Sequence, residues 1–270
     1  MADRFRRIVP LQDEGTARPL FCIHAISGSA FAYAGLADLL GTDQPVYGIE
    51  AAGFDDDEPP VRSLPDLGAG YSDMLLEFCP DRDFWLLGWS MGGVVAFDMA
   101  WRLCSAGAKV RRVILIDVEL PWVAPLPCEK QIEYRFIRDL LSVAGENTAD
   151  LDPIFEDKPD DITPAAMFAA VERSAILPEE LDADLLEERY VVFRAHLEAL
   201  FGYAVNYIYD GPVVHIRSSS SDPAYMRWDT VASDLTEVVI PGNHHSIWRG
   251  AALAELAGNV RRVLSEDHSV

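Results

Sequence analysis

Short apolar runs alternate along the chain with longer segments of helical spacing. Six apolar runs predict buried strands, at residues 19–24, 45–49, 84–89, 113–116, 213–217 and 237–240. Segments with apolar residues every three or four positions predict helices at residues 30–40, 63–78, 91–106 and 249–264. Residues before about 17 mix charged and small polar residues, which is typical of a lead-in strand or linker. This alternation predicts an α/β fold with a mostly parallel, doubly wound sheet.

The pattern changes between residues 121 and 203, where no convincing strand is found. Helical spacing recurs at residues 129–143, 164–174 and 181–202, and an acid-rich loop occupies residues 147–161. A long insertion between two strands has to lie over the edge of the sheet. We therefore expect a helical lid at about residues 122–204, above the carboxyl ends of the strands where ligands bind in such sheets. The alternative is an ordinary helical layer on one face of the sheet.

Length and composition narrow the function classes. A chain of 270 residues that is 50% hydrophobic is expected to form a single domain over residues 1–270. The net charge of −22 argues against nucleic acid and anionic membranes as partners. No apolar stretch is long enough to span a bilayer and no secretory signal is recognised, so a cytoplasmic protein is expected. The four cysteines lack metal-binding spacing, and the apolar runs around Cys22 and Cys104 predict buried, reduced thiols and no metal.

One strand-to-helix junction carries a candidate nucleophile. The pentapeptide Gly88-Trp89-Ser90-Met91-Gly92 follows an apolar run and opens a helix without breakers. Small residues two positions before and after the serine leave room for a sharp, strained turn. Such a nucleophile elbow raises the Ser90 hydroxyl above the sheet at the positive end of a helix, where a developing oxyanion is stabilised.

A serine needs a base to take its proton and a carboxylate to orient that base. His244 and His245 follow the last predicted strand, and we favour His244 because the turn before it lets it reach back first. The acid is either Asp117, which ends the strand after the elbow helix, or Asp222, which follows the next strand and could instead form a turn. We favour Asp117. The order Ser, Asp, His matches the chain order of the α/β-hydrolase fold.

An oxyanion hole requires two donors near the nucleophile. The backbone N–H of Met91 follows the serine directly, and the small-residue loop after the first apolar run offers the N–H of Ile26. Together these groups predict acyl transfer through a serine ester.

The same stretches resemble the thioesterase domains of nonribosomal peptide and polyketide synthases. The resemblance rests on residues 19–29 (PLFCIHAISGS), Tyr33, Leu36, residues 45–53 (PVYGIEAAG), residues 88–93 (GWSMGG), Ile116-Asp117 with Pro121, and Gly242-Asn243-His244 with Ser246. It covers nearly the whole chain except the lid. The chain departs from the family in having Ala25 where a proline usually follows the histidine.

The resemblance implies a chain-terminating enzyme with Ser90 as nucleophile, His244 as base and Asp117 as orienting acid. A peptidyl or polyketide chain would arrive on the phosphopantetheine of an acyl or peptidyl carrier protein, with no bound cofactor, and would leave by hydrolysis or macrocyclisation. The lid would exclude or admit water. Apolar lid residues are candidates for the pocket walls, although each could simply be core: Phe168, Leu177, Phe193, Leu197 and Phe201.

Three alternatives remain at this stage. A stand-alone editing thioesterase would clear misacylated carriers and favour small acyl groups. A general carboxylesterase would ignore carrier-bound substrates, and a catalytically silent binding protein would use the same scaffold without turnover.

Overall fold

A single mixed sheet forms the centre of the computed structural model, which describes residues 5–156, 158–159, 161–178 and 180–265. Its strands are β1 (Ile8–Gln12), β2 (Leu20–Ile23), β3 (Val46–Ile49), β4 (Asp83–Trp89), β5 (Lys109–Ile116), β6 (Tyr209–Ser218) and β7 (Ala232–Ile240). They lie in the order β1-β3-β2-β4-β5-β6-β7. Only β1 runs antiparallel to its neighbour, so the predicted parallel sheet is confirmed and the lead-in segment contributes an edge strand.

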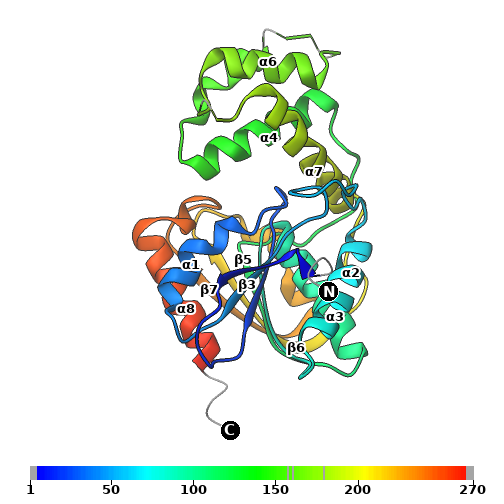
Figure 1. Cartoon of the computed structure of the whole chain (residues 1–270), viewed down its shortest axis with the longest axis vertical. Helices are drawn as coiled ribbons and strands as arrows, with labels where there is room; N and C mark the ends of the chain where they lie inside the picture. The colour runs from blue at the N-terminus through cyan, green and yellow to red at the C-terminus, as the bar shows by residue number, and fades with distance from the viewer. Residues whose placement is uncertain (1–4, 157, 160, 179, 266–270) are drawn as a thin grey trace.

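Helices cover both faces of this sheet (Figure 1). The helices α2 (Leu64–Phe78) and α3 (Met91–Ser105) pack on one face, and α1 (Ala34–Leu40) and α8 (Gly250–Ser265) pack on the other. Successive residues of the central strands alternate between the two cores: Phe84 and Leu86 join the first, while Trp85 and Leu87 join the second. Because the strands are buried on both faces, they read as continuous apolar runs in the sequence.

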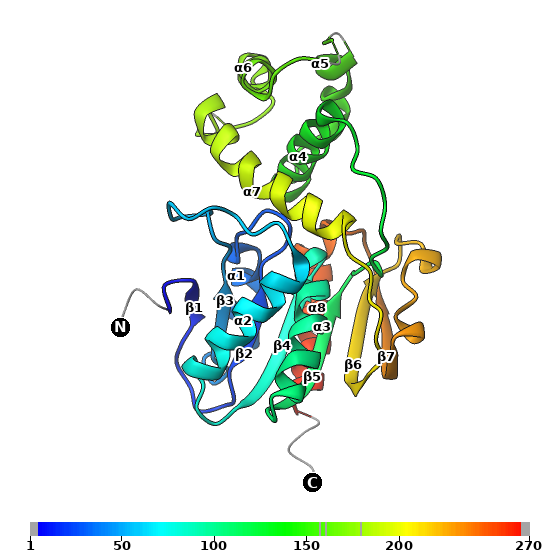
Figure 2. The same cartoon turned by 90° about the vertical axis from the view of Figure 1, so that its right-hand side faces the viewer.

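The insertion between β5 and β6 forms a separate helical layer above the sheet (Figure 2). It contains α4 (Glu129–Ala144), α5 (Asp152–Glu156), α6 (Pro164–Ser174) and α7 (Ala183–Phe201). The sequence predicted only a loop where α5 lies, because this helix of five residues buries only Phe155 and so has no apolar periodicity. Residues 157 and 160 of that predicted loop lie outside the described residues. The lid packs around an apolar cluster of its own, apart from the two cores of the sheet.

Three details of the sequence prediction need correction. The strands β6 and β7 begin four and five residues before their predicted starts at residues 213 and 237, because their first residues are largely polar and β6 contains Pro212. Cys104, the third, is exposed and not buried, because it shares the outward face of α3 with Trp101 and Ser105.

Within the described ranges, none of the helices combines the length and the apolar character needed to cross a bilayer.

Candidate active site

The junction of β4 and α3 has the strained geometry of a nucleophile elbow. Ser90 has φ 54° and ψ −131°, a conformation that L-residues rarely adopt. A Cβ at Gly88 would lie 2.1 Å from the carbonyl oxygen of Gly92, and one at Gly92 would lie 2.3 Å from that of Ile23. Both glycines are therefore required by close backbone contacts, as the sequence spacing predicted.

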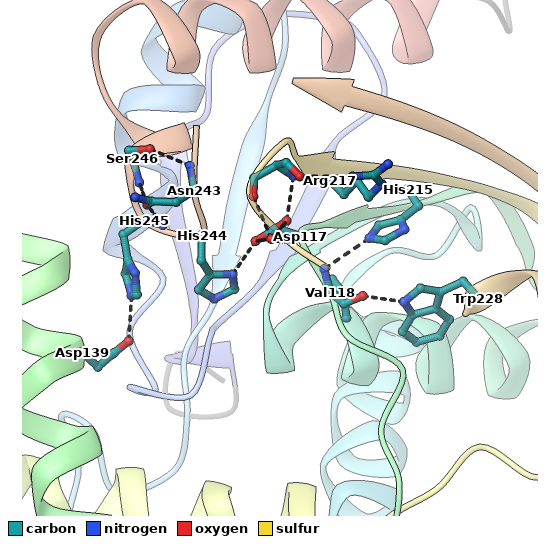
Figure 3. A network of polar contacts seen from close by, with 12 residues as sticks. Asp117, Val118, Asp139, His215, Arg217, Trp228, Asn243, His244, His245 and Ser246 are labelled. Atoms are coloured by element: carbon teal, nitrogen blue, oxygen red, sulfur yellow. Dashed lines mark hydrogen bonds and ion pairs between the residues drawn. The ribbon is translucent and has the colours of Figure 1, made fainter. Parts of the chain in front are cut away.

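Asp117 and His244 meet at the carboxyl ends of the strands (Figure 3). Asp117 Oδ2 accepts a hydrogen bond from His244 Nδ1 at 2.7 Å, while Oδ1 accepts one from the Ser218 N–H at 2.7 Å. The hydroxyl of Ser221 donates to the same carboxylate at 2.8 Å. Burial opposes the ionisation of Asp117, but the hydrogen bonds from His244, Ser218 and Ser221 outweigh it and lower the Asp117 pKa to about 2. The imidazole therefore faces a carboxylate that is charged at neutral pH.

The two competing residues have other partners. Asp222 Oδ1 accepts from the Ala224 N–H at 2.9 Å and caps a short 3₁₀ turn. His245 Nε2 lies 3.0 Å from Asp139 on α4, so this ring is directed to the lid. The structure thus brings Asp117 and His244 together and leaves Asp222 and His245 outside this pair.

The ring of Trp89, next to the serine, packs against His244 with centroids 5.1 Å apart. In the part of the chain that the structure describes, the Ser90 hydroxyl makes no hydrogen bond to His244. Such contacts are often long before substrate binds and tighten afterwards.

Two backbone N–H groups next to the elbow have no hydrogen-bond acceptor among the described residues. Over the described ranges, no hydrogen bond uses the N–H of Ile26 or of Met91. Met91 is the first residue of α3, so its N–H points out of the helix terminus. The serine, the Asp–His pair and these two donors are the groups that serine acyl transfer requires.

The five predicted pocket residues separate into two groups. Phe168, Leu177 and Phe193 belong to the apolar cluster inside the lid. Leu197 also belongs to this cluster and Phe201 packs against it, but both lie on the last turns of α7 and line a cavity of about 300 Å³ that also reaches Glu119, two residues after Asp117. Leu197 and Phe201 are therefore the two of the five that line this cavity.

The sequence analysis assigned no supporting role to Ser218, Ser221 or Tyr33. Ser218 and Ser221 lie at the carboxyl end of β6, where the Ser218 N–H and the Ser221 hydroxyl donate to Asp117. Tyr33 donates to the Ile23 carbonyl at 2.5 Å and accepts from the Trp89 N–H at 2.9 Å, which ties the ends of β2 and β4 together. The position of the four serines at residues 218–221, at the carboxyl end of a sheet strand, is the one signal that could have indicated Ser221, whereas the bond from Ser218 is made by its backbone and has no signal in the sequence.

The fold and this set of residues define a member of the α/β-hydrolase class. The family model described as "Thioesterase domain" matches residues 18–264. The chain belongs to this family, and the resemblance inferred from the sequence is confirmed.

The relatives that match are large synthetases. The chain is 37% identical over 110 residues to a "Dimodular nonribosomal peptide synthase" of Bacillus subtilis (strain 168), covering 41% of this chain and 5% of that protein. It is 34% identical over 128 residues to the "Malpinin synthetase" of Mortierella alpina, covering 47% of this chain and 2% of that protein. The chain thus spans only a small part of the length of these relatives.

Solved structures share the fold. One is a four-domain nonribosomal peptide synthetase bound to AMP and glycine, with a TM-score of 0.82 at 22% identity over 95% of this chain and 20% of that one. Another is the NocB thioesterase domain from the nocardicin cluster in covalent complex with a fluorophosphonate nocardicin G analog. Its TM-score is 0.68 at 24% identity, over 96% of this chain and 100% of that one.

Proposed function

We propose that this chain is a product-releasing thioesterase domain. Ser90 attacks the thioester of an acyl chain held on the phosphopantetheine of a carrier protein, while His244 takes the hydroxyl proton and Asp117 stabilises the imidazolium. The thiol of the carrier leaves with that proton. Water or a nucleophile within the chain then attacks the Ser90 ester and releases an acid or a ring.

One observation carries this proposal: a buried Asp117 carboxylate holds Nδ1 of His244 at 2.7 Å, beside a serine on a strained elbow. With Nδ1 donating to the carboxylate, the lone pair of Nε2 is available to accept a proton. The backbone donors Ile26 and Met91 are free to bind the oxyanion that forms on the thioester oxygen.

The cavity beside Leu197 and Phe201 is the proposed acyl pocket. Its lining combines apolar groups from α7 with Trp122 from the segment after β5. Arg135 of α4 lies over the Phe201 ring at 5.6 Å and gives the wall a cationic group. A pocket built from lid and sheet together suits an acyl chain longer than acetyl.

The position of the acid favours chain release over editing. The resemblance implies that chain-terminating members carry the acid where Asp117 lies, whereas editing thioesterases carry it after the later strand. Here Asp222, after that later strand, caps a turn, and among the described residues no hydrogen bond or ion pair joins it to His244.

The test is intact mass spectrometry of the protein after mixing with peptidyl and acetyl thioesters of a pantetheine mimic. We expect a peptidyl adduct or released product with the wild type and neither with Ser90→Ala. The product mass separates the acid from the ring. A matched control is Ser220→Ala, an exposed serine near the same rim whose hydroxyl makes no hydrogen bond among the described residues, and it should react like the wild type.

Other outcomes identify the alternatives. Turnover of the acetyl thioester alone would favour an editing enzyme, and a preference for oxygen esters would favour a carboxylesterase. A protein whose Ser90 reacts with neither thioester would contradict the proposed enzyme and favour a binding protein.

A further inference from the structure

Two histidines outside the Asp117–His244 pair are stacked beside the loop that carries Ile26. His24 follows β2 and His196 lies on the lid helix α7, and both side chains are fully buried. Their ring centroids are 4.8 Å apart and their planes are inclined by only 16°. The stack therefore joins the lid to the end of a central strand.

The hydrogen bonds of these rings define their tautomers. His24 Nδ1 lies 2.7 Å from the Ala25 carbonyl and His196 Nδ1 lies 2.8 Å from the Ile26 carbonyl. A carbonyl oxygen can only accept, so both rings carry their proton on Nδ1. His24 Nε2 in turn accepts from the Tyr71 hydroxyl at 2.7 Å. Burial lowers the pKa of His24 to about 3 and that of His196 to about 4, so both rings are neutral at neutral pH.

These two bonds fix the peptide planes on both sides of Ile26. In a trans peptide the C=O and the N–H point in opposite directions, and none of the described peptides is cis. Holding the Ala25 carbonyl therefore sets the direction of the Ile26 N–H, because the two groups share one plane. Holding the Ile26 carbonyl fixes the next peptide plane, which joins Ile26 to Ser27. The residue cannot rotate without breaking a buried hydrogen bond.

The helix α7 also contacts this loop through packing. A Cβ at Gly28, which has φ +89°, would lie 2.8 Å from Val192 Cγ1 of α7. On its other side, the Gly28 carbonyl accepts from the Ala51 N–H at 2.9 Å. The loop is thus enclosed between α7 and the segment after β3.

We propose that His24 and His196 are positioning residues for the oxyanion hole: His24 aims the Ile26 N–H through the Ala25 carbonyl, and His196 makes the fixing of the next peptide plane depend on the seating of the lid helix α7. A displacement of α7 would withdraw the Nδ1 donor from the Ile26 carbonyl and leave Ile26 held on one side only. The lid then controls the chemical step as well as access to the site. This inference rests on the proposed acyl transfer at Ser90.

The test uses a fluorophosphonate, whose phosphoryl oxygen occupies an oxyanion hole and whose labelling of Ser90 requires no natural acyl chain. His196→Phe keeps a flat ring in the stack but removes the donor, whereas His196→Asn keeps an amide N–H near the Nδ1 position. We expect His196→Phe to slow the labelling of Ser90 by about tenfold, less than the 10²–10³ that removal of an oxyanion donor costs, because His24 still holds the Ala25 carbonyl. His196→Asn should recover labelling to within about threefold of the wild type.

A matched control removes another buried hydrogen bond in the same region. Tyr203→Phe, just after α7, loses the hydrogen bonds to Asp98 Oδ1 at 3.3 Å and to the Tyr207 hydroxyl at 3.4 Å, and neither of these partners lies in the loop that carries Ile26. It should label at the wild-type rate. With a reactive thioester, His196→Phe should lower kcat and leave KM within about twofold, because the lost contact acts on the transition state.

Three results would overturn the inference: labelling of His196→Phe at the wild-type rate, His196→Asn as slow as His196→Phe, or an equal slowing in Tyr203→Phe. Labelling that depends on His196 without any thioester turnover would overturn the proposed function and support the inference. Wild-type protein that is not labelled at all would overturn both.

A measurement on the wild type covers the case in which His196→Phe does not fold. In protein labelled with ¹⁵N-histidine, the His196 proton should be found on Nδ1 and exchange slowly, and its resonance should shift when Ser90 is labelled. A proton on Nε2 of His196 would contradict the proposed bond.

Discussion

The elbow in the sheet is constrained by close backbone contacts, whereas the lid is constrained by side-chain packing. At the elbow, backbone atoms approach so closely that a Cβ at Gly92 would lie 2.3 Å from a carbonyl oxygen. In the lid, side chains pack around a cluster of their own. In the sheet, backbone atoms surround the elbow so closely that an added side chain at Gly92 strains the backbone. In the lid the contacts are between side chains, so a substitution there costs less stability.

The two regions are joined largely through α7 and a small number of polar contacts. Arg249 donates to the carbonyls of Ser142 and Val143 at the end of α4, and His245 lies 3.0 Å from Asp139. Arg62 pairs with Glu198 of α7 at 2.9 Å. These contacts are partly exposed, and each is worth about 1 kcal/mol or less. These polar contacts therefore add little to the attachment of the lid, which depends more on the buried contacts of α7 with the loop after β2.

The largest expected effect concerns the acid of the proposed triad. Asp117→Asn should lower kcat by about 10⁴-fold, because an amide cannot hold His244 in the required tautomer. Steady-state kinetics with the peptidyl thioester would measure this loss. Asp222→Asn, at the turn, is the matched control and should stay within about threefold of the wild type, as the cap can still accept from Ala224. Equal losses in both variants would contradict the assignment.

Adding a single methyl group at Gly92 tests the rigidity of the elbow. Gly92→Ala should destabilise the protein by about 3 kcal/mol, because the new Cβ meets the carbonyls of Ile23 and His24. Urea unfolding would measure the change. Gly258→Ala in α8 meets no atom within 4 Å and should stabilise by about 1 kcal/mol through helix propensity. A tolerated Gly92→Ala would show that the sheet is less constrained than the geometry indicates.

Substitutions in the lid should change substrate selectivity where the residue lines the cavity, and should change stability where it does not. Leu197→Trp fills part of the cavity and should lower kcat/KM for a peptidyl thioester about tenfold more than for an acetyl thioester. Phe168→Leu, in the lid cluster, should cost about 1 kcal/mol of stability and leave the ratio of the two substrates unchanged. A changed ratio in Phe168→Leu would place the pocket deeper inside the lid.

The smallest effect is expected at the contact between α4 and the histidine loop. Asp139→Asn removes the charge facing His245 and should weaken the docking of the lid by about 0.5 kcal/mol. Hydrogen exchange of the α4 amides should then be about twofold faster, in proportion to the population of open lid. Asp150→Asn, an exposed change elsewhere in the lid, should leave these rates unaltered. Faster exchange in both variants would indicate a general loss of helix stability.

What the sequence could predict follows the same division. The elbow and the buried strands are local features, because glycine spacing around Ser90 and apolar runs such as residues 113–116 depend on adjacent residues alone. The preference for Asp117 over Asp222 needed the resemblance as well, since both acids follow sheet strands. The residues of the candidate site could therefore be named from the sequence more readily than the residues that support them.

The missed features depend on contacts between distant segments. Ser221 reaches Asp117 only because the loop after β6 folds over the end of β5, and His196 reaches Ile26 across 170 residues of sequence. The outward position of Cys104 depends on which side of α3 faces the sheet near its last turn. No local pattern encodes these arrangements.

The thiols left on the surface have a practical consequence. Cys104 lies on a helix of the sheet region and Cys128 immediately precedes α4 of the lid, and both are exposed. Cys22 is fully buried, and burial raises the pKa of its thiol, so its thiolate is scarce. Cys79 is half-buried, and its replacement by serine would leave one reactive thiol on each side of the boundary. A pair of spin labels on these two native sites would report the distance distribution between lid and sheet with and without an acyl chain on Ser90.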